Sequence, residues 1–395
     1  MRTRAMRMSG LLLWLAAGLS TLGILFFAHG SARADWEWDA RGGAILKLDD
    51  YRSETDLNTG VGLGFLELGV LGPSLGGIEF GLNWFGLAEI WERRAGDFKR
   101  CCVDTQDFRE AFVRWQPSDA ASGVRAGRFR IRMPGLDGHS HLGIEAVWEQ
   151  SPALVVRAAM IDRWIDNSLT ILNFRGVSGW RDVGDIAPGA GDQFWLASVR
   201  SEFGRQGFIE AFAGYQSKIM LLHGLEYGWS FAQSEARSWD LDGIVAVYGN
   251  EWPRTPETAD YRDVLSWRIH LRRHVAPWTL GIGTFGVSDD PGDLGAGIFD
   301  WFTPMTVDAI IPFDDRNNAR LLFATLDYAS GRKKVNVRYG IGNNRDLGVR
   351  SQELDLFTYY ELTPSWELAG FIAYNRYTSM IPTYLRSGMR LTRYF

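Results

Sequence analysis

Polar and apolar side chains alternate residue by residue along the segment 262–274, and this alternation limits how the chain can fold more than any other feature. The polar positions are Arg262, Ser266, Arg268, His270, Arg272 and His274. The apolar positions between them are Leu265, Trp267, Ile269 and Leu271. Side chains of a β-strand point alternately to its two sides, whereas a helix would spread these charges around its circumference. The pattern therefore predicts a strand with one charged face and one apolar face.

Four further segments show the same period of two. Their polar residues are Glu79, Gly81 and Asn83; Arg128, Arg130 and Arg132; Lys334, Asn336 and Arg338; and Glu353, Asp355 and Glu361. Strands of a membrane barrel alternate between lipid and a polar interior. We therefore expect these residues to face a lumen. Their apolar neighbours, including Phe129, Ile131 and Met133, should then face lipid.

Residues 35–395 contain no apolar run long enough for a membrane helix. A chain that spans a membrane without such helices must close into a barrel, because lipid cannot satisfy free backbone N–H and C=O groups. The 45 glycines, the 17 tryptophans and an aromatic content of 13% suit a membrane barrel. A soluble all-β protein is the alternative, but its strands should not carry charge so regularly on one face.

The first 34 residues have the three parts of a secretory signal peptide. Basic residues Arg2, Arg4 and Arg7 precede an apolar run, and Ala32-Arg33-Ala34 forms a small-residue cleavage site. An uncleaved membrane anchor is the alternative interpretation. Cleavage would remove only basic charge, so the mature chain is more acidic than the formal net charge of −5 for the whole chain. This balance argues against nucleic acid as a partner.

Turn-forming residues divide residues 35–395 into about 18 strands of one antiparallel barrel, the even number expected of bacterial barrels. We place the short turns, such as Gly72–Gly76, Ala276-Pro277 and Thr363-Pro364, in the periplasm. The long loops, including 92–106, 166–190, 218–225, 251–261 and 290–315, should lie outside the cell. The chain ends in an amphipathic strand with a terminal aromatic, Phe395. This ending resembles the signal that the barrel-assembly machinery reads.

Short sequence blocks resemble those of the alginate-export outer membrane porin family. Arg109-Glu110-Ala-Phe-Val, Gly127-Arg128-Phe-Arg130, Ile144-Glu145-Ala146 and Gln352-Glu353-Leu354-Asp355-Leu356 follow the family's order. The resemblance implies a monomeric barrel with a charged lumen, in which Arg109, Arg128 and Arg130 select a uronate polymer. It makes Glu110 their charged neighbour and Glu353 and Asp355 acids of the lumen. The chain departs from the family at His139 and His141 and at the short turn Thr363-Pro364.

Rows of inward arginines give a pore anion selectivity, because the planar guanidinium stays charged and binds carboxylates with two hydrogen bonds. Alternatively, the arginines pair with lumen acids such as Glu110, Glu353 and Asp355. The sequence leaves both interpretations open. The candidate solute pathway comprises Arg109, Glu110, Arg128, Arg130, Arg132, Arg268, Arg272, Arg338, Glu353 and Asp355.

Catalysis and metal binding find weak support in the sequence. Ser266, His270 and His274 share one strand face, but no G-x-S-x-G motif accompanies them. The adjacent Cys101 and Cys102 and the pair His139 and His141 lack further ligands at a workable spacing. We therefore predict neither an enzyme nor a cofactor.

The sequence thus predicts an outer membrane channel of the alginate-export type that passes an anionic polysaccharide. An anion-leaning porin for small-solute uptake and a non-conducting structural or adhesive barrel are the alternatives. The partners expected are membrane lipid, the barrel-assembly machinery and periplasmic polysaccharide-export proteins.

Overall fold

The computed structural model describes residues 36–51, 58–95, 97, 106–117, 122–134, 136, 140–165, 181–182, 193–204, 206–234, 237–251, 263–288, 318–345, 348–377 and 383–395. The predicted signal peptide, the two cysteines and His139 lie outside these residues. Among the described residues, no helix is long and apolar enough to cross a membrane.

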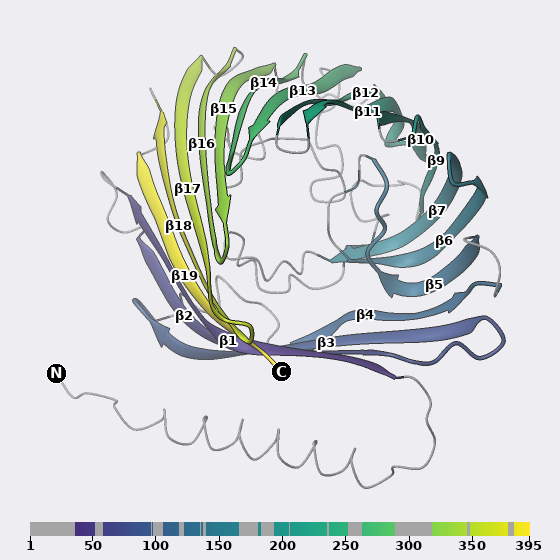
Figure 1. The fold of residues 1–395 in the computed structure, drawn as a ribbon, viewed down its shortest axis with the longest axis horizontal. Helices are drawn as coiled ribbons and strands as arrows, with labels where there is room; N and C mark the ends of the chain where they lie inside the picture. The colour runs from purple at the N-terminus through teal and green to yellow at the C-terminus, as the bar shows by residue number, and fades with distance from the viewer. Residues whose placement is uncertain are drawn as a thin grey trace, which may run out of the picture.

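The described strands form one antiparallel sheet that closes on itself (Figure 1). Closure occurs where β1 pairs on one side with β2 and on the other with β19. The strands are β1 Glu37–Tyr51, β2 Thr59–Leu71, β3 Ile78–Glu92, β4 Gln106–Trp115, β5 Gly123–Phe129, β6 Ser140–Ser151, β7 Leu154–Ile165, β8 Arg181–Asp182, β9 Phe194–Glu202, β10 Gly207–Gln216, β11 Met220–Ser234, β12 Arg237–Asn250, β13 Val264–Val275, β14 Trp278–Val287, β15 Ala319–Ser330, β16 Lys333–Asn344, β17 Val349–Thr363, β18 Trp366–Tyr377 and β19 Tyr384–Tyr394.

Eighteen of these strands make the barrel wall, as the turn pattern predicted. The two-residue β8 pairs only with β7, at the end of β7 beyond its pairing with β9. The short connections lie together at one end of the barrel, where β1 also begins and β19 also ends. They are residues 72–77, 152–153, 276–277, 331–332 and 364–365. We call it the short-turn end and the opposite end the long-loop end. The long loop predicted over 218–225 is wrong, because β10 and β11 are joined by residues 217–219 alone.

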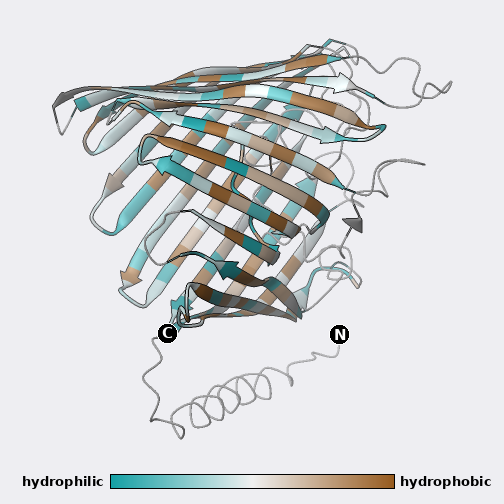
Figure 2. Cartoon of the chain, turned by 90° about the vertical axis from the view of Figure 1, so that its right-hand side faces the viewer, coloured by the Kyte–Doolittle hydropathy of each residue, from teal (hydrophilic) through white to brown (hydrophobic). Residues whose placement is uncertain are grey.

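The predicted alternation is confirmed along most of the wall. In β13, Leu265, Ile269 and Leu271 are exposed on the outer face, while Arg268 and Arg272 lie on the other face. The polar and apolar faces of β3, β16, β17 and β19 are placed as predicted. Figure 2 shows the resulting change between hydrophobic and hydrophilic residues along the tilted strands. The apolar outer face is what a barrel surrounded by lipid requires.

The segment 124–133 is an exception, and its predicted orientation is wrong. Arg128 pairs with Ala111 and Leu142, which are at outward-facing positions of their strands, so Arg128 is also at an outward-facing position (outward parity). Phe129, the next residue, is completely buried on the inner side. The inward residue of β5 is Arg125, which binds Glu145 and lies 4.0 Å from the centre of the Phe129 ring. Strand β5 ends at Phe129, so the period of two does not apply to Arg130 and Arg132.

Much of the inner wall is apolar, whereas the sequence pattern predicted charged residues on the inner face. Large buried side chains cover the inner face of β7 and β9–β15 in the half nearer the long-loop end. They join the segment 131–136 in one cluster that contains Phe129, Ile131, Met133, Leu136, Ile161, Phe194, Phe212, Leu222, Tyr248, Phe285 and Phe323. The buried Phe129 therefore has apolar neighbours inside the barrel, which explains its inward position. The polar lumen is confined to the remaining parts of the inner wall.

Candidate functional site: the charged lumen

A single acid, Glu67, holds two arginines together on the inner face of β1–β4. Its carboxylate oxygens lie 2.6 Å from Arg41 Nη2 and 2.9 Å from Arg109 Nη1. Asn83 Nδ2 also donates to Glu67 Oε1, at 3.1 Å. The side chains of Arg109 and Glu67 are each 7% exposed, so this is a buried ion pair. We call Arg41, Glu67, Asn83 and Arg109 the Glu67 hub.

Arginine outnumbers acid within the hub itself, and the charge of Asp39 also acts on Arg41. Arg109 occupies a bulge of β4, and the positive charges of Arg41 and Arg130 both act on it. Glu110, the predicted neighbour, instead pairs across the strands with Asn83. It lines a small cavity of about 270 Å³ near the short-turn end. Glu37 and Asp39 line the same cavity, so these three acids lie between the hub and the short-turn end, and we call them the acidic mouth.

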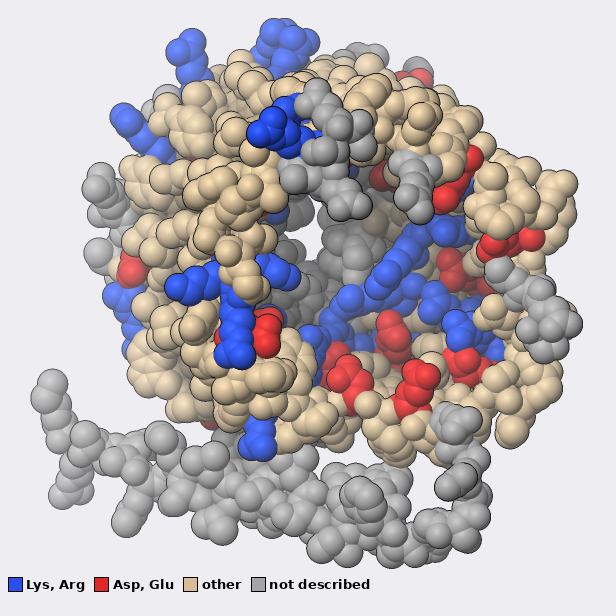
Figure 3. All heavy atoms as spheres, viewed as in Figure 1, with Lys and Arg blue, Asp and Glu red and all other residues tan. Residues whose placement is uncertain are grey.

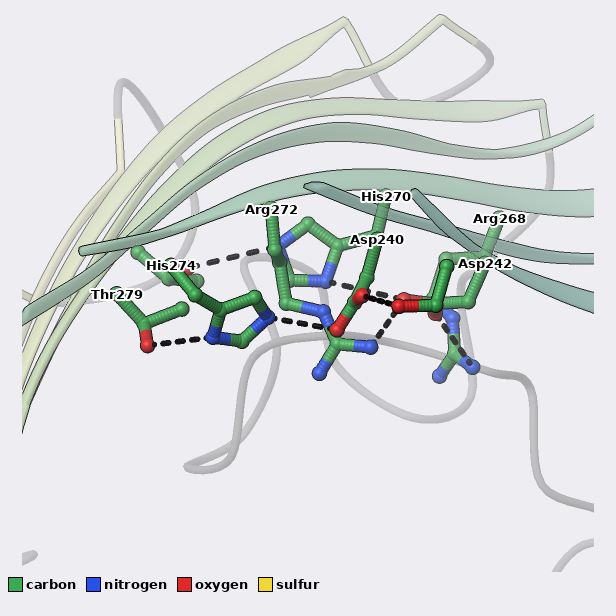
Figure 4. A network of polar contacts seen from close by, with 9 residues as sticks. Asp240, Asp242, Arg268, His270, Arg272, His274 and Thr279 are labelled. Atoms are coloured by element: carbon green, nitrogen blue, oxygen red, sulfur yellow. Dashed lines mark hydrogen bonds and ion pairs between the residues drawn. The ribbon is translucent and has the colours of Figure 1, made fainter. Parts of the chain in front are cut away.

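A second charged network joins β12 and β13 on the inner face (Figure 4). Asp242 lies 2.8 Å from Arg272 Nη2 and 3.9 Å from Arg268 Nη2. Asp240 accepts a hydrogen bond from Ser230 at 2.7 Å and lies 2.6 Å from His274 Nε2. The network exists because the register places Asp240 opposite Arg272, so that inward residues of the two strands meet. Arg268 and Arg272 are therefore paired with acid.

Neighbouring strands extend this second network around the wall. Glu210 of β10 lies 3.7 Å from Arg157 Nη1 and 3.5 Å from Arg200 Nη1. Glu226 of β11 stands opposite Glu210 and is close enough to interact with both Arg200 and Arg268. Viewed along the barrel, Figure 3 shows basic and acidic side chains side by side inside the opening.

The structure does not bring all predicted pathway residues together. Glu353 and Asp355 point inward but are completely buried, so they do not line open space. Arg338 donates from Nε to Asn336 Oδ1 at 2.9 Å, on β16, which β17, β18 and β19 separate from β1 of the hub. Arg132 is exposed, and its carbonyl oxygen accepts a hydrogen bond from Arg157. These positions exclude the predicted continuous row of Arg128, Arg130 and Arg132.

Sequence reasoning missed the acids that organise the lumen. Glu67 is the only charged residue of β2, and its parity matches that of the inward Phe65. A lone charge in an otherwise apolar strand was therefore the available signal. Asp240 and Asp242 share the parity of an inward face, which is a similar signal in β12.

The possible Ser–His arrangement does not form. Ser266 and His270 are four residues apart on β13, which is about 13 Å along an extended strand. His274 instead contacts Asp240 and Thr279, the latter at 2.9 Å. Among the described residues, no group of three His, Cys, Asp or Glu side chains is placed to hold a metal ion.

These arginines retain hydrogen-bond donors that their own ion pairs do not use. A guanidinium group has five N–H donors, and one carboxylate engages at most two in the bidentate arrangement. Arg41, Arg200 and Arg272 have side chains that are 29%, 27% and 35% exposed. The charged wall can therefore bind an anion while its own ion pairs hold the arginines in position.

Comparison with solved structures identifies the architecture. The chain is similar to Pseudomonas aeruginosa OpdQ, with 16% identity, a TM-score of 0.70, and coverage of 91% of this chain and 99% of that one. Pseudomonas aeruginosa OpdK, solved with vanillate, also has 16% identity, with a TM-score of 0.71 and coverage of 91% and 98%. The fold is that of the outer membrane porins.

A BenF-like porin from Pseudomonas fluorescens Pf-5 has 10% identity and a TM-score of 0.73 over 91% of this chain and 98% of that one. No protein-family model matches the sequence, and a comparison with curated proteins finds no similar sequence. The expected barrel is therefore confirmed as a porin fold. The finer resemblance to alginate exporters is not supported, since the similar solved structures described here are porins of other names.

Proposed function

We propose that the protein is an outer membrane porin for the uptake of small anionic solutes, in particular small carboxylates. The observation that carries the proposal is the Glu67 hub, where Arg41, Arg109 and the nearby Arg130 surround one acid. This excess of positive charge lies on the inner face of a closed barrel. Fixed positive charge in a low-dielectric tube favours anions over cations.

The neighbouring folds support small solutes over a polymer. OpdK was crystallised with vanillate, a small aromatic carboxylate. Such a solute fits the charged part of the inner wall, because arginine binds a carboxylate through two parallel hydrogen bonds. Vanillate and benzoate are therefore suitable first solutes to test.

Ion selectivity in planar bilayers tests the proposal. In a salt gradient, the reversal potential of the wild type should show a preference for anions. Arg41→Gln removes a partly exposed positive charge of the hub and should move the reversal potential toward cations. Arg393→Gln is the matched control, because Arg393 is exposed on the outer face. A cation-selective wild type, or an unchanged potential in Arg41→Gln, would refute the proposal.

Export of an anionic polysaccharide is the less supported alternative. Of the arginines that the alginate-export resemblance assigns to polymer, Arg128 has outward parity and Arg109 is buried against Glu67. A deletion strain that still secretes its polysaccharides but loses carboxylate uptake would separate the two functions. Absence of single-channel conductance would instead favour a non-conducting structural or adhesive barrel.

The proposed setting is the outer membrane, with the short-turn end in the periplasm. In support, the short connections lie together at that end, as the periplasmic turns of bacterial barrels do. Exposed tryptophans, including Trp38, Trp115 and Trp278, lie on the outer face near the same end. Aromatic residues of this kind form girdles at membrane interfaces. A monomeric state and recognition of the Phe395 strand by the assembly machinery are part of the same proposal. Periplasmic polysaccharide-export partners belong only to the alternative function.

A further inference from the structure

Three arginines cluster on the outer face of the wall, where most of the surface is apolar. Arg320 of β15 stands opposite Asn343 of β16, which in turn stands opposite Arg350 of β17. Arg376 of β18 lies on the same face, one strand beyond Arg350. All three arginines are exposed and lie within two residues of a strand end at the long-loop end. Figure 3 shows basic side chains projecting outward from this part of the barrel.

A groove connects these arginines with the apolar outer surface. Its volume is about 710 Å³, and its lining includes Arg320, Arg350 and Arg376 together with Leu322 and Ile341. Leu322 and Ile341 are 59% and 48% exposed. They pair with each other two residues further along β15 and β16 than Arg320 and Asn343, toward the middle of the barrel. The groove therefore has a basic upper part and an apolar lower part. A lipid with an anionic head group has this same division.

The position of the arginines requires an explanation. A basic side chain on the lipid face of a barrel costs about 2–4 kcal/mol at the bilayer midplane and about 0–1 kcal/mol near the interface. The strand ends place this cluster near the interface. Neither Arg320 nor Arg376 forms an ion pair with any residue that the structure describes. Their guanidinium groups are thus available to an external anion at head-group depth.

We propose that this groove binds the phosphorylated glycolipid of the outer leaflet, with its phosphates on the arginines and its acyl chains along Leu322 and Ile341. Arginine binds phosphate through bidentate, charge-assisted hydrogen bonds. Two strand spacings separate Arg320 from Arg350, which is about 10 Å. The amides of Asn343 and Gln352 lie on the same face and can hydrogen-bond to sugar hydroxyls, which favours a glycolipid over a phospholipid. The proposal rests on the outer membrane placement but not on conduction.

Native mass spectrometry of the purified barrel, titrated with diphosphorylated lipid A, tests this inference. The variant carries Arg320→Gln, Arg350→Gln and Arg376→Gln. The matched control carries Arg273→Gln and Arg393→Gln, which remove outward arginines near the short-turn end. Phosphatidylglycerol serves as the phospholipid probe. The heat-dependent shift of the folded barrel in gel electrophoresis checks that each variant folds.

We expect the triple variant to bind lipid A at least about tenfold more weakly, because each arginine loses charge-assisted hydrogen bonds. The control variant should bind lipid A as the wild type does, and anion selectivity should be unchanged in both. Equal losses in variant and control, or no loss in the triple variant, would overturn the proposal. Phosphatidylglycerol binding of equal strength and equal dependence on the arginines would assign the groove to phospholipid instead. If the triple variant does not fold, Arg320→Gln and Arg376→Gln singly should each give a partial loss, and no loss in either refutes the site.

Discussion

Replacing Glu67 with glutamine tests how strongly the hub depends on its only acid. Glutamine keeps an acceptor oxygen for Asn83 and Arg109 but removes the negative charge. Arg109 would then remain buried, with Arg41 and Arg130 as like-charged neighbours. Removal of one partner from a buried pair typically costs about 3–5 kcal/mol. We expect Glu67→Gln to lower the free energy of unfolding by about this amount.

The neighbouring pair of Glu79 and Arg114 provides the control. It joins the adjacent strands β3 and β4 at 2.7 Å, but the Arg114 side chain is 39% exposed. A pair with one partner this exposed costs less to break than a buried pair, so Glu79→Gln should lower stability by less than Glu67→Gln does. Urea unfolding followed by tryptophan fluorescence measures both variants, and a lower midpoint at constant slope reports stability alone. Equal losses in the two variants would refute the conclusion that burial decides the cost.

Three further predictions address closure, packing and selectivity. Gly43→Ala should prevent folding, because the added Cβ would lie 1.8 Å from the Leu391 carbonyl oxygen of β19. Gly64→Ala should fold normally, since its nearest new contact is at 3.5 Å; electrophoresis of folded barrels compares the two. Phe129→Ala should lower the free energy of unfolding in urea by about 3–5 kcal/mol, and a small loss would contradict its inward packing. Asp242→Asn should move the reversal potential toward anions, because Arg268 and Arg272 lose their counter-charge; no movement would contradict this pairing.

The period of two was sufficient to predict the barrel and the orientation of most strands. It succeeded where lipid lies on one side and polar groups on the other, as along β13 and β17. It failed at Phe129 because the interior there is itself apolar, so hydrophobicity no longer distinguishes the two faces. The predicted loop 218–225 was too long, also because apolar side chains lie on the inner face there. Ile219, Met220 and Leu222 are buried apolar residues at a tight connection, where sequence gives no strand boundary.

The partners of the lumen arginines depend on register, which the sequence did not give. A shift of one residue between β12 and β13 would bring Asp242 opposite an outward residue in place of His270. The ion pairs of Glu67 and Asp242 join residues far apart in the chain, as Arg386 and Asp49 do where β19 meets β1. Parity alone could place such residues on the inner face. It could not distinguish free arginines from paired ones.

Pairing and anion selectivity are compatible in this lumen, because the two depend on different donors of the same side chains. An unpaired arginine in a narrow pore would hold a carboxylate tightly and slow its release. An acid at each arginine lowers the local charge and fixes the guanidinium plane, while leaving other N–H groups directed to the solute. Glu210 and Asp242 also each face two arginines, but at the Glu67 hub a third arginine, Arg130, acts on the pair. The strongest anion site of the pathway should therefore lie there, just inside the acidic mouth formed by Glu37, Asp39 and Glu110.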